Sequence, residues 1–310
     1  MAGTRRRPGS NRRPLAFGAV AVALVGLLVL SLRLVPGAPL QPTANSRPAP
    51  TADRGAAPPT DRNSRPTPSP SLEPLPFQAR DLDDLDIEGW YAWAVLDKRT
   101  GKVIGSADMG ETSTTASLIK AWVVADYLRR SAEAGKTPGA AKLADATKII
   151  RDSDNARAQD FYESVGGVAS IKRLISMCGL TDSKPAADGG WSRTALSSRD
   201  TARLGLCIDN GRAAGPKWTK WLLGEMREVR GVGDFGIRKA FPAAEQKKIA
   251  IKNGWIDRQK EKEYHVNCLA VGDTWTMGVM VRSPFGVDGG WEYGMDACER
   301  ITKALLRPAA

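Results

Sequence analysis

Ser117 and Lys120 have the residue types and the spacing for covalent chemistry. They stand in Thr112–Trp122, where a run of hydroxyl residues leads into an apolar stretch with helical spacing. Residues three apart share a helix face, and the first turn offers free backbone N–H groups that would stabilise an oxyanion. Since a Ser-x-x-Lys arises by chance about once in a chain of this length, the pair predicts a nucleophile and base only with further support.

Two more short motifs follow in order. Ser153-Asp154-Asn155 stands where a helix is expected to begin, and Lys252-Asn253-Gly254 stands at the end of an expected strand. Each has an ordinary structural explanation, because Ser, Asp and Asn are common helix caps and Asn-Gly is a common turn. What makes them informative is their order after Ser117 and their places, at an expected helix start and at an expected strand end.

The ordered set resembles the motifs of the serine β-lactamase and penicillin-binding transpeptidase superfamily. The resemblance covers nearly all of residues 85–307 and is strongest to the class A branch. It implies an α/β (α+β) fold, with a five-stranded antiparallel sheet flanked by helices and an all-helical subdomain.

The resemblance also implies catalytic roles. Ser117 would attack an acyl carbonyl, and Lys120 would accept its proton, provided that positive neighbours lower the lysine pKa. Ser153 would pass a proton to the leaving nitrogen. The single histidine, His265, is not needed for this chemistry and is predicted to be a strand residue near the sheet edge.

The substrate-binding residues implied by the resemblance are Asn155, Lys252, Asn253, Gly254 and Trp255. Asn155 would hold the substrate's side-chain amide, and Lys252 would supply positive potential near a substrate carboxylate. The backbone N–H groups of Ser117 and Trp255 would form the oxyanion hole.

This chain departs from the family at two places. Class A enzymes place a glutamate in a loop after the second motif, whereas residues 180–200 offer only Asp182, Asp188 and Asp200. We expect none of them to replace it, so acylation should outpace deacylation, as in a penicillin-binding protein. Asn253 replaces a usual threonine, and Trp255 adds a bulky ring, which puts carboxylate recognition in doubt and would narrow the cleft.

The hydrophobic patterns predict the elements that position these residues. Trp90–Leu96 and Lys102–Ser106 form an expected hairpin, and three strand-like runs come late in the chain, with a turn at Gly254–Asp257 after the first. The late runs are Lys248–Lys252, Tyr264–Val271 and Thr274–Val281. Helical spacing is found at 144–150, 156–165, 168–177, 198–208 and 216–227, and in a terminal helix from Trp291 to Leu305.

The first 80 residues differ from the rest. Residues 1–14 are a basic tail, and residues 15–35 hold an uncharged apolar run that is long enough for a membrane anchor with a cytoplasmic N-terminus. A cleaved signal peptide is the alternative. Residues 36–80 are predicted to form a proline-rich, disordered linker, and residues 81–310 are the predicted hydrolase domain.

Charge and composition exclude other classes. The formal net charge is +11, but residues 1–80 contain eleven Arg, no Lys, two Asp and one Glu, which is +8 of it. The domain therefore has no nucleic-acid footprint. One histidine and no C-x-x-C argue against zinc, and no cofactor is expected.

The four cysteines, Cys178, Cys207, Cys268 and Cys298, suit an exported domain. Of the three ways to pair them, we predict Cys178–Cys207 within the helical block and Cys268–Cys298 between a strand and the terminal helix. Four buried, unpaired thiols are the alternative.

The sequence thus predicts an extracytoplasmic active-site serine hydrolase or acyltransferase that acts on cell-wall peptides or amides and is acylated by β-lactams at Ser117. A non-catalytic penicillin-binding-like module and a true β-lactamase with an atypical loop are the alternatives.

Overall fold

The computed structural model describes residues 72–82 and 84–308. The predicted tail (1–14), anchor (15–35) and most of the linker lie outside these residues. Among the described residues, no helix combines the length and the apolar character needed to cross a membrane.

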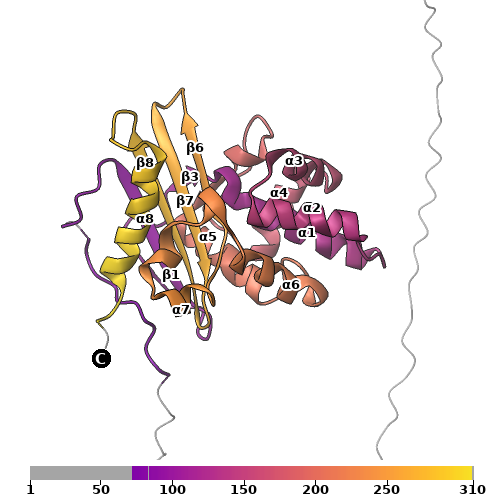
Figure 1. Cartoon of the computed structure of the whole chain (residues 1–310), viewed down its shortest axis with the longest axis horizontal. Coiled ribbons are helices and arrows are strands. Elements are labelled where there is room, and N and C mark those ends of the chain that lie inside the picture. Colours follow the sequence, from indigo (N-terminus) through magenta and orange to yellow (C-terminus); the bar gives the residue numbers. More distant parts are fainter. Residues whose placement is uncertain (1–71, 83, 309–310) are drawn as a thin grey trace, which may run out of the picture. The chain divides into compact units, whose positions relative to one another are not determined.

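The centre of the domain is an antiparallel sheet (Figure 1). Its order is β2-β1-β8-β7, and both β5 and β6 pair with β7. The strands are β1 (Trp90–Asp97), β2 (Val103–Gly105), β5 (Ala250–Ile251), β6 (Gly254–Arg258), β7 (Glu263–Val271) and β8 (Trp275–Pro284).

β5 and β6 occupy successive stretches of one edge of β7. Ile251 pairs with Ala270, and Gly254 pairs with Asn267. The sheet therefore has six strands in five positions, one more strand than the five predicted, and the predicted antiparallel arrangement is confirmed. The predicted turn at Gly254–Asp257 is wrong, because the strand resumes there and the chain reverses only after Arg258.

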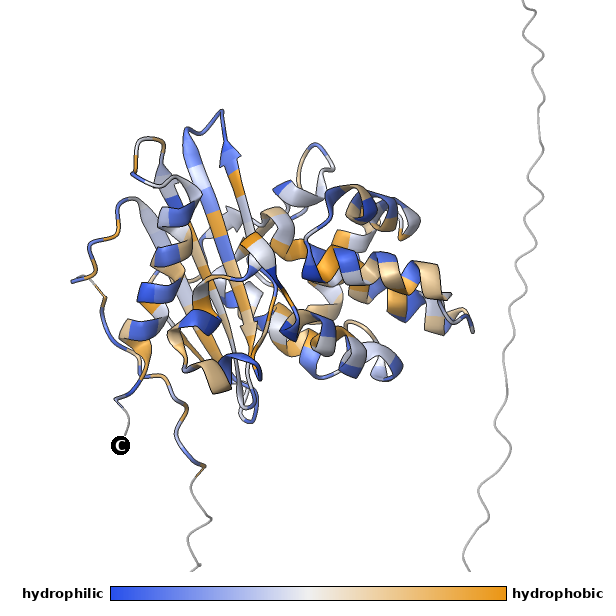
Figure 2. Ribbon diagram, viewed as in Figure 1, coloured by the Kyte–Doolittle hydropathy of each residue, from blue (hydrophilic) through white to orange (hydrophobic). Residues whose placement is uncertain are grey.

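Helices cover both faces of the sheet. α8 (Trp291–Leu305) packs on β7 and β8 where Gly294 meets Val266, and α5 (Ser198–Asp209) packs where Gly205 meets Leu269 (Figure 1). Val266 and Leu269 differ by an odd number of positions, so they lie on opposite faces. The buried residues of α8 recur at three- and four-residue spacing, and the helix alternates hydrophilic and hydrophobic residues (Figure 2).

A helical block lies beside the sheet (Figure 1). Its members are α1 (Lys120–Glu133), α2 (Ala140–Arg151), α3 (Asn155–Ser164), α4 (Val168–Cys178) and α6 (Pro216–Arg227). Local sequence fixes several ends. Asp154 caps α3 by accepting from the N–H of Arg157 (2.9 Å), and Gly179 ends α4 in the left-handed conformation.

Short elements link the block to the sheet. β3 (Thr112–Thr114) pairs with β4 (Ala195–Ser197), and the 3₁₀ helix η1 (Ala116–Ile119) leads from β3 into α1. The remaining elements are η2 (Trp191–Arg193), η3 (Gly231–Gly233), η4 (Gly236–Ala240) and α7 (Ala243–Gln246).

Both predicted disulfides are present. Cys178–Cys207 joins α4 to α5 with a Cα–Cα distance of 5.4 Å, and Cys268–Cys298 joins β7 to α8 at 6.7 Å. Each bond connects segments that pack against each other.

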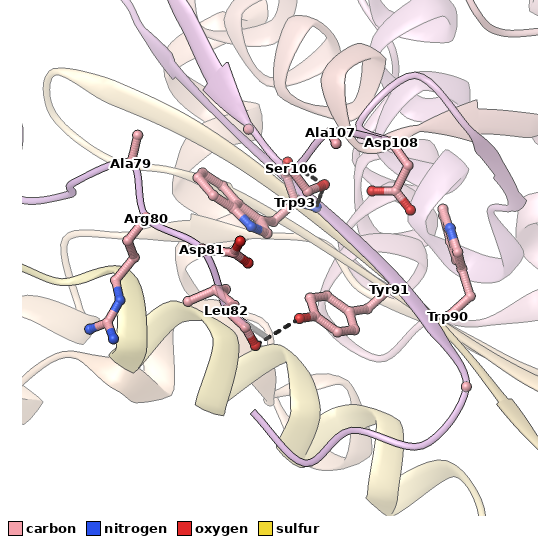
Figure 3. Close-up of a pocket in the computed structure, with 12 residues that line it drawn as sticks. Ala79, Arg80, Asp81, Leu82, Trp90, Tyr91, Trp93, Ser106, Ala107 and Asp108 are labelled. Carbon is pink, nitrogen blue, oxygen red and sulfur yellow. Dashed lines mark hydrogen bonds between the residues drawn. The ribbon is translucent and has the colours of Figure 1, made fainter. Parts of the chain in front are cut away.

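Part of the described segment that precedes residue 81 packs on the domain. Phe77 is buried against Trp275 and Phe241, and its backbone bridges Leu306. One aromatic side chain of the predicted linker thus packs on the domain. Between this segment and β1 lies a hollow of about 710 Å³, near which the Tyr91 hydroxyl donates to the Leu82 carbonyl (3.0 Å; Figure 3). None of the predicted site residues lines it.

Candidate active site

Ser117 lies at the junction between β3 and α1. It is the second residue of η1, and it lines a cavity of about 380 Å³ together with Asn155 and Trp255. The preceding residue, Ala116, has φ = 46°, in the left-handed region that a non-glycine residue adopts at a cost. In the described chain Ser117 Oγ has no protein hydrogen-bond partner, which leaves the hydroxyl available in the cleft.

Lys120 is fully buried one turn after Ser117. Its Nζ donates to the carbonyl oxygen of Ser153, to Ser153 Oγ (3.3 Å) and to Asn155 Oδ1 (2.6 Å). Burial lowers the pKa of Lys120 to about 7, although the nearby Asp154 carboxylate opposes the shift. Near neutral pH, a large share of this amine is therefore unprotonated and able to accept a proton.

Lys252 lies between β5 and β6, and its side chain reaches Ser153 Oγ, the atom that Lys120 also contacts. It is fully buried, and its Nζ donates to Ser153 Oγ at 3.0 Å. Burial first, and then the charge of Lys120, lower the pKa of Lys252 well below its ordinary value. Ser153 Oγ thus lies between two amines, as a hydroxyl that relays protons would.

Gly254 brings β6 against the backbone of Ser117. A Cβ at this position would lie 2.3 Å from Thr115 O and 2.7 Å from Ser117 N, so no other residue fits. Trp255 follows, lines the cavity and packs edge-on against Phe235 at 5.7 Å. The oxyanion hole remains a prediction, and this close approach is the geometry that it needs.

The side chain of Asn253 does not face the cavity. It is buried, and its amide donates to the carbonyls of Gly233 (3.1 Å) and Phe235 (2.8 Å). Its predicted contact with substrate thus differs from the arrangement in the structure, where the amide holds the neighbouring loop.

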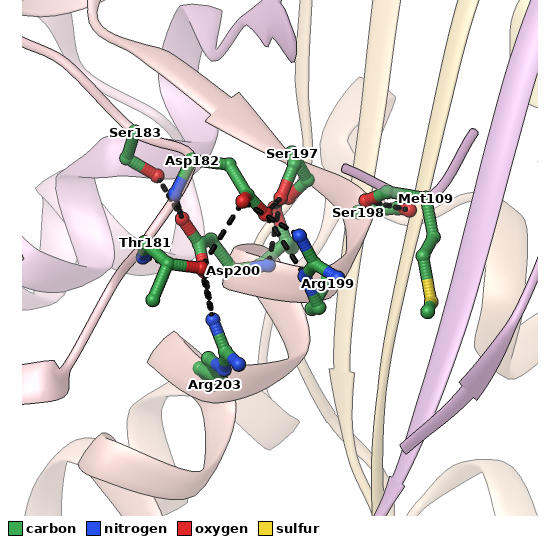
Figure 4. A network of polar contacts seen from close by, with 10 residues as sticks. Met109, Thr181, Asp182, Ser183, Ser197, Ser198, Arg199, Asp200 and Arg203 are labelled. Atoms are coloured by element: carbon green, nitrogen blue, oxygen red, sulfur yellow. Dashed lines mark hydrogen bonds and ion pairs between the residues drawn. The ribbon is translucent and has the colours of Figure 1, made fainter. Parts of the chain in front are cut away.

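Two of the three loop aspartates hold the loop in place. Asp200 accepts from the N–H groups of Thr181 (3.2 Å) and Asp182 (2.7 Å), and Asp182 pairs with Arg199 at 2.7 Å (Figure 4). Burial acts to raise the pKa of the Asp182 carboxyl, but the hydrogen bonds that it accepts from Arg199, Ser197 and Thr181 outweigh burial and lower the pKa below its ordinary value. Both carboxylates are structural anchors.

Trp191, rather than a carboxylate, covers Lys120. Its ring centroid lies 5.1 Å from Lys120 Nζ, and its Nε1 donates to Gln159 Oε1 at 2.8 Å. Asp188, the third aspartate, is more than half exposed and pairs with Arg193 at 3.2 Å. The hydrogen bonds of Lys120 Nζ in the described chain go to Ser153 and Asn155, not to a carboxylate of residues 180–200.

His265 is a buried residue of β7 and contacts β3. Its Nδ1 lies 2.8 Å from Thr114 Oγ1, and its Nε2 lies 3.1 Å from Glu263. Burial lowers its pKa, against the effect of Glu263. It does not line the cavity.

Sequence reasoning missed part of the cavity wall. Trp191, Ser192, Gln159 and Ile256 all line it, but their sequence contexts show no motif or period that marks them. Only the expected loop after the second motif pointed to their neighbourhood.

The fold is that of class A β-lactamases. An extended-spectrum β-lactamase, TLA-3, superposes with a TM-score of 0.60 at 14% identity, over 72% of this chain and 95% of that one. TLA-1 gives 0.59 at 14% identity over 71% and 92%, and a β-lactamase from Xanthomonas campestris gives 0.55 at 16% identity over 70% and 90%. The described domain therefore has a serine β-lactamase-like fold, as the sequence motifs predicted.

Curated relatives come from mycobacteria. "Putative lipoprotein LppW" of Mycobacterium tuberculosis is 24% identical over 167 residues, and its Mycobacterium bovis counterpart matches equally. The match covers 53% of this chain and 53% of each relative, so the chain spans about half the length of the curated relatives it matches. No protein-family model matches the chain.

Proposed function

We propose that the domain is an active-site serine hydrolase or acyltransferase that acts on cell-wall peptides or amides and is acylated by β-lactams at Ser117. The observation that carries the proposal is the buried Lys120, whose amine binds Ser153 and Asn155 and has its pKa lowered to about 7. A lysine held in this state next to an available serine is suited to activate it.

The proposed acylation needs only these groups. Ser117 Oγ attacks the acyl carbonyl, and its proton passes to the neutral Lys120 amine. The oxyanion is held by the N–H groups of Ser117 and Trp255. Lys120 then returns the proton through Ser153 Oγ to the leaving nitrogen, while the acyl–nitrogen bond breaks and the acyl–Ser117 ester remains.

Hydrolysis of that ester is expected to be slow. Water attack needs a base near the ester, and Trp191 covers the place next to Lys120 where a loop carboxylate could act. This favours a penicillin-binding protein over a rapid β-lactamase.

An extracytoplasmic location is part of the proposal. Two disulfides favour an oxidising compartment, and the related mycobacterial protein is named as a lipoprotein. The proposed anchor, residues 15–35, lies outside the described residues.

Mass spectrometry of the digested protein tests the chemistry. The full chain is incubated with benzylpenicillin and, separately, with p-nitrophenyl acetate, and the peptide that carries Ser117 is followed with time. We expect a lasting adduct on Ser117 and none in Ser117→Ala. Rapid loss of the adduct with product release would indicate a β-lactamase or esterase, and no adduct from either reagent would indicate a binding module without catalysis.

A further inference from the structure

The cavity beside Ser117 has no charged residue in its wall. Its apolar surface comes from two indoles, Trp191 and Trp255, and from Ile256, and its polar groups are neutral. A ligand carboxylate placed here would lose water without gaining a cation, which is costly. The wall instead suits an apolar acyl group that can stack on an indole.

Lys252, which lies three residues before Trp255, is already engaged. Lys252 is fully buried, does not line the cavity and donates to Ser153 Oγ. Its charged form is disfavoured by burial and by Lys120. It therefore offers little positive potential for an anionic ligand.

Two arginines are close in sequence to wall residues, but neither of them lines the cavity. Arg258, on the same strand as Trp255, is buried and donates to Thr114 Oγ1 (2.9 Å) and to the carbonyl of Ser192 (2.7 Å). Arg193, next to the cavity residue Ser192, is ion-paired with Asp188.

Of the three side-chain amides at or near the cavity, those of Asn253 and Gln159 are likewise occupied. Asn253 Nδ2 donates to two loop carbonyls, and Gln159 Nε2 donates to Glu163 at 2.7 Å. Asn155 accepts from Lys120 through Oδ1, so its amide nitrogen stays available for the carbonyl of a neutral ligand.

We infer that the cleft selects neutral acyl donors: esters or amides that have an apolar acyl group and no carboxylate beside the scissile bond. The inference rests on the proposed acyl-enzyme chemistry and narrows its substrate class. The bond changes are those given above. The acyl–Ser117 bond forms, the bond to the alcohol or amine breaks, and the Ser117 proton leaves with that group through Lys120 and Ser153.

A matched pair of ligands tests the inference on the full chain. Benzylpenicillin and its methyl ester share the acyl group and the reacting bond and differ in one charge. We expect the methyl ester to acylate Ser117 with a second-order rate constant at least tenfold higher, at 0.15 M salt to screen the basic N-terminal region. Equal rates, or a faster acid, would overturn the inference and leave the proposed function intact. If neither ligand nor p-nitrophenyl acetate modifies Ser117, both fail.

Adding a cation to the wall gives a second test. Ile256→Arg should lower the ester-to-acid rate ratio at least tenfold, with Ser192→Arg as a second variant if the first does not fold. Leu72→Arg adds the same charge at an exposed position away from the cavity and should leave the ratio unchanged. An unchanged ratio in a folded wall variant would overturn the inference, because the wall charge would then not set selectivity.

Discussion

In the proposed reaction, the rate of acylation depends on the protonation state of Lys120. Its pKa is about 7, and the neutral amine is the form that accepts the Ser117 proton. We therefore predict that acylation rises about tenfold per pH unit below 7 and levels off above it. The measurement is the second-order rate constant for a neutral ester between pH 5 and 9, which avoids any titration of the ligand.

Lys120→Ala supplies the control for this pH profile. Its residual rate should be at least 100-fold lower and should not show the step near 7, in line with the 10²–10⁴-fold range of general-base catalysis. An identical pH step in the variant would show that another group titrates.

We expect Trp191 to limit the second half of the proposed reaction, the hydrolysis of the acyl-enzyme. Trp191→Glu places a carboxylate beside the ester, and we predict that it hydrolyses the acyl-enzyme at least tenfold faster than the natural chain. The same carboxylate should raise the pKa of Lys120 and slow acylation at pH 7. The two steps are separated by isolating the penicillin adduct and following its mass as it decays.

Two further variants at Trp191 separate the effect of an added carboxylate from the effect of removing the indole ring. Trp191→Phe should keep the adduct lifetime within about twofold, and Trp191→Ala shows what access of water alone contributes. If the Glu and Ala variants decay at the natural rate, Trp191 does not limit hydrolysis, and the slow step lies elsewhere.

The sequence predicted the site residues unevenly for physical reasons. Ser153 and Lys252 belong to short motifs that can be recognised in the sequence. In the structure, Ser153 Oγ accepts hydrogen bonds from both Lys120 and Lys252. Trp191 has no such signal, because its role depends on where a loop of residues 180–197 is anchored by Asp182 and Asp200. The orientation of the Asn253 side chain could not be predicted from the sequence either, because it depends on hydrogen bonds to carbonyls 18 and 20 residues away.

At the scale of elements, β6 and η1 are held closer together than side chains would allow. Gly254→Ala would place a Cβ 2.3 Å from Thr115 O and would push β6 away from Ser117. We predict a loss of Ser117 acylation of at least tenfold, because the proposed oxyanion donors would separate. Acylation kinetics with p-nitrophenyl acetate measure the effect.

Gly224→Ala is the matched control in α6. A Cβ at Gly224 has no atom within 4 Å, so this variant should acylate normally and should gain up to about 1 kcal/mol of stability from helix propensity. If both variants acylate like the natural chain, the close approach at Gly254 is not needed for catalysis.

The same contact explains the failed turn prediction. Asn-Gly is a common hairpin turn, so residues 254–257 were expected to reverse the chain. Here Gly254 serves close approach to Ser117, and the pairing of Trp255 with Val266 continues the strand. Strand periodicity predicted β1, β7 and β8 well, because their burial is set by the sheet itself.

At the scale of the molecule, each disulfide joins segments about 30 residues apart. Closing a loop of that length lowers the entropy of the unfolded chain, and we predict that Cys178→Ala/Cys207→Ala lowers the free energy of unfolding by about 3–4 kcal/mol. Urea denaturation with and without reductant measures it. The double variant should lose part of its sensitivity to reductant, and full sensitivity would assign the stabilisation to Cys268–Cys298 alone.

The two ends of the described chain pair with each other on the domain. Phe77 is buried between Trp275 and Phe241, and the N–H of Gln78 donates to the carbonyl of Leu305 (2.9 Å). We predict that Phe77→Ala lowers the free energy of unfolding by about 3–5 kcal/mol, as expected for the loss of a buried aromatic side chain.

Phe77 lines no part of the cavity, so the folded fraction of Phe77→Ala should still acylate at the natural rate. Leu72→Ala, at a position that is 57% exposed, is the control and should change stability by less than about 0.5 kcal/mol. Equal stability of the two variants in urea would mean that the segment before residue 81 rests on the domain without supporting it, and the folded unit would then begin where the sequence alone predicted.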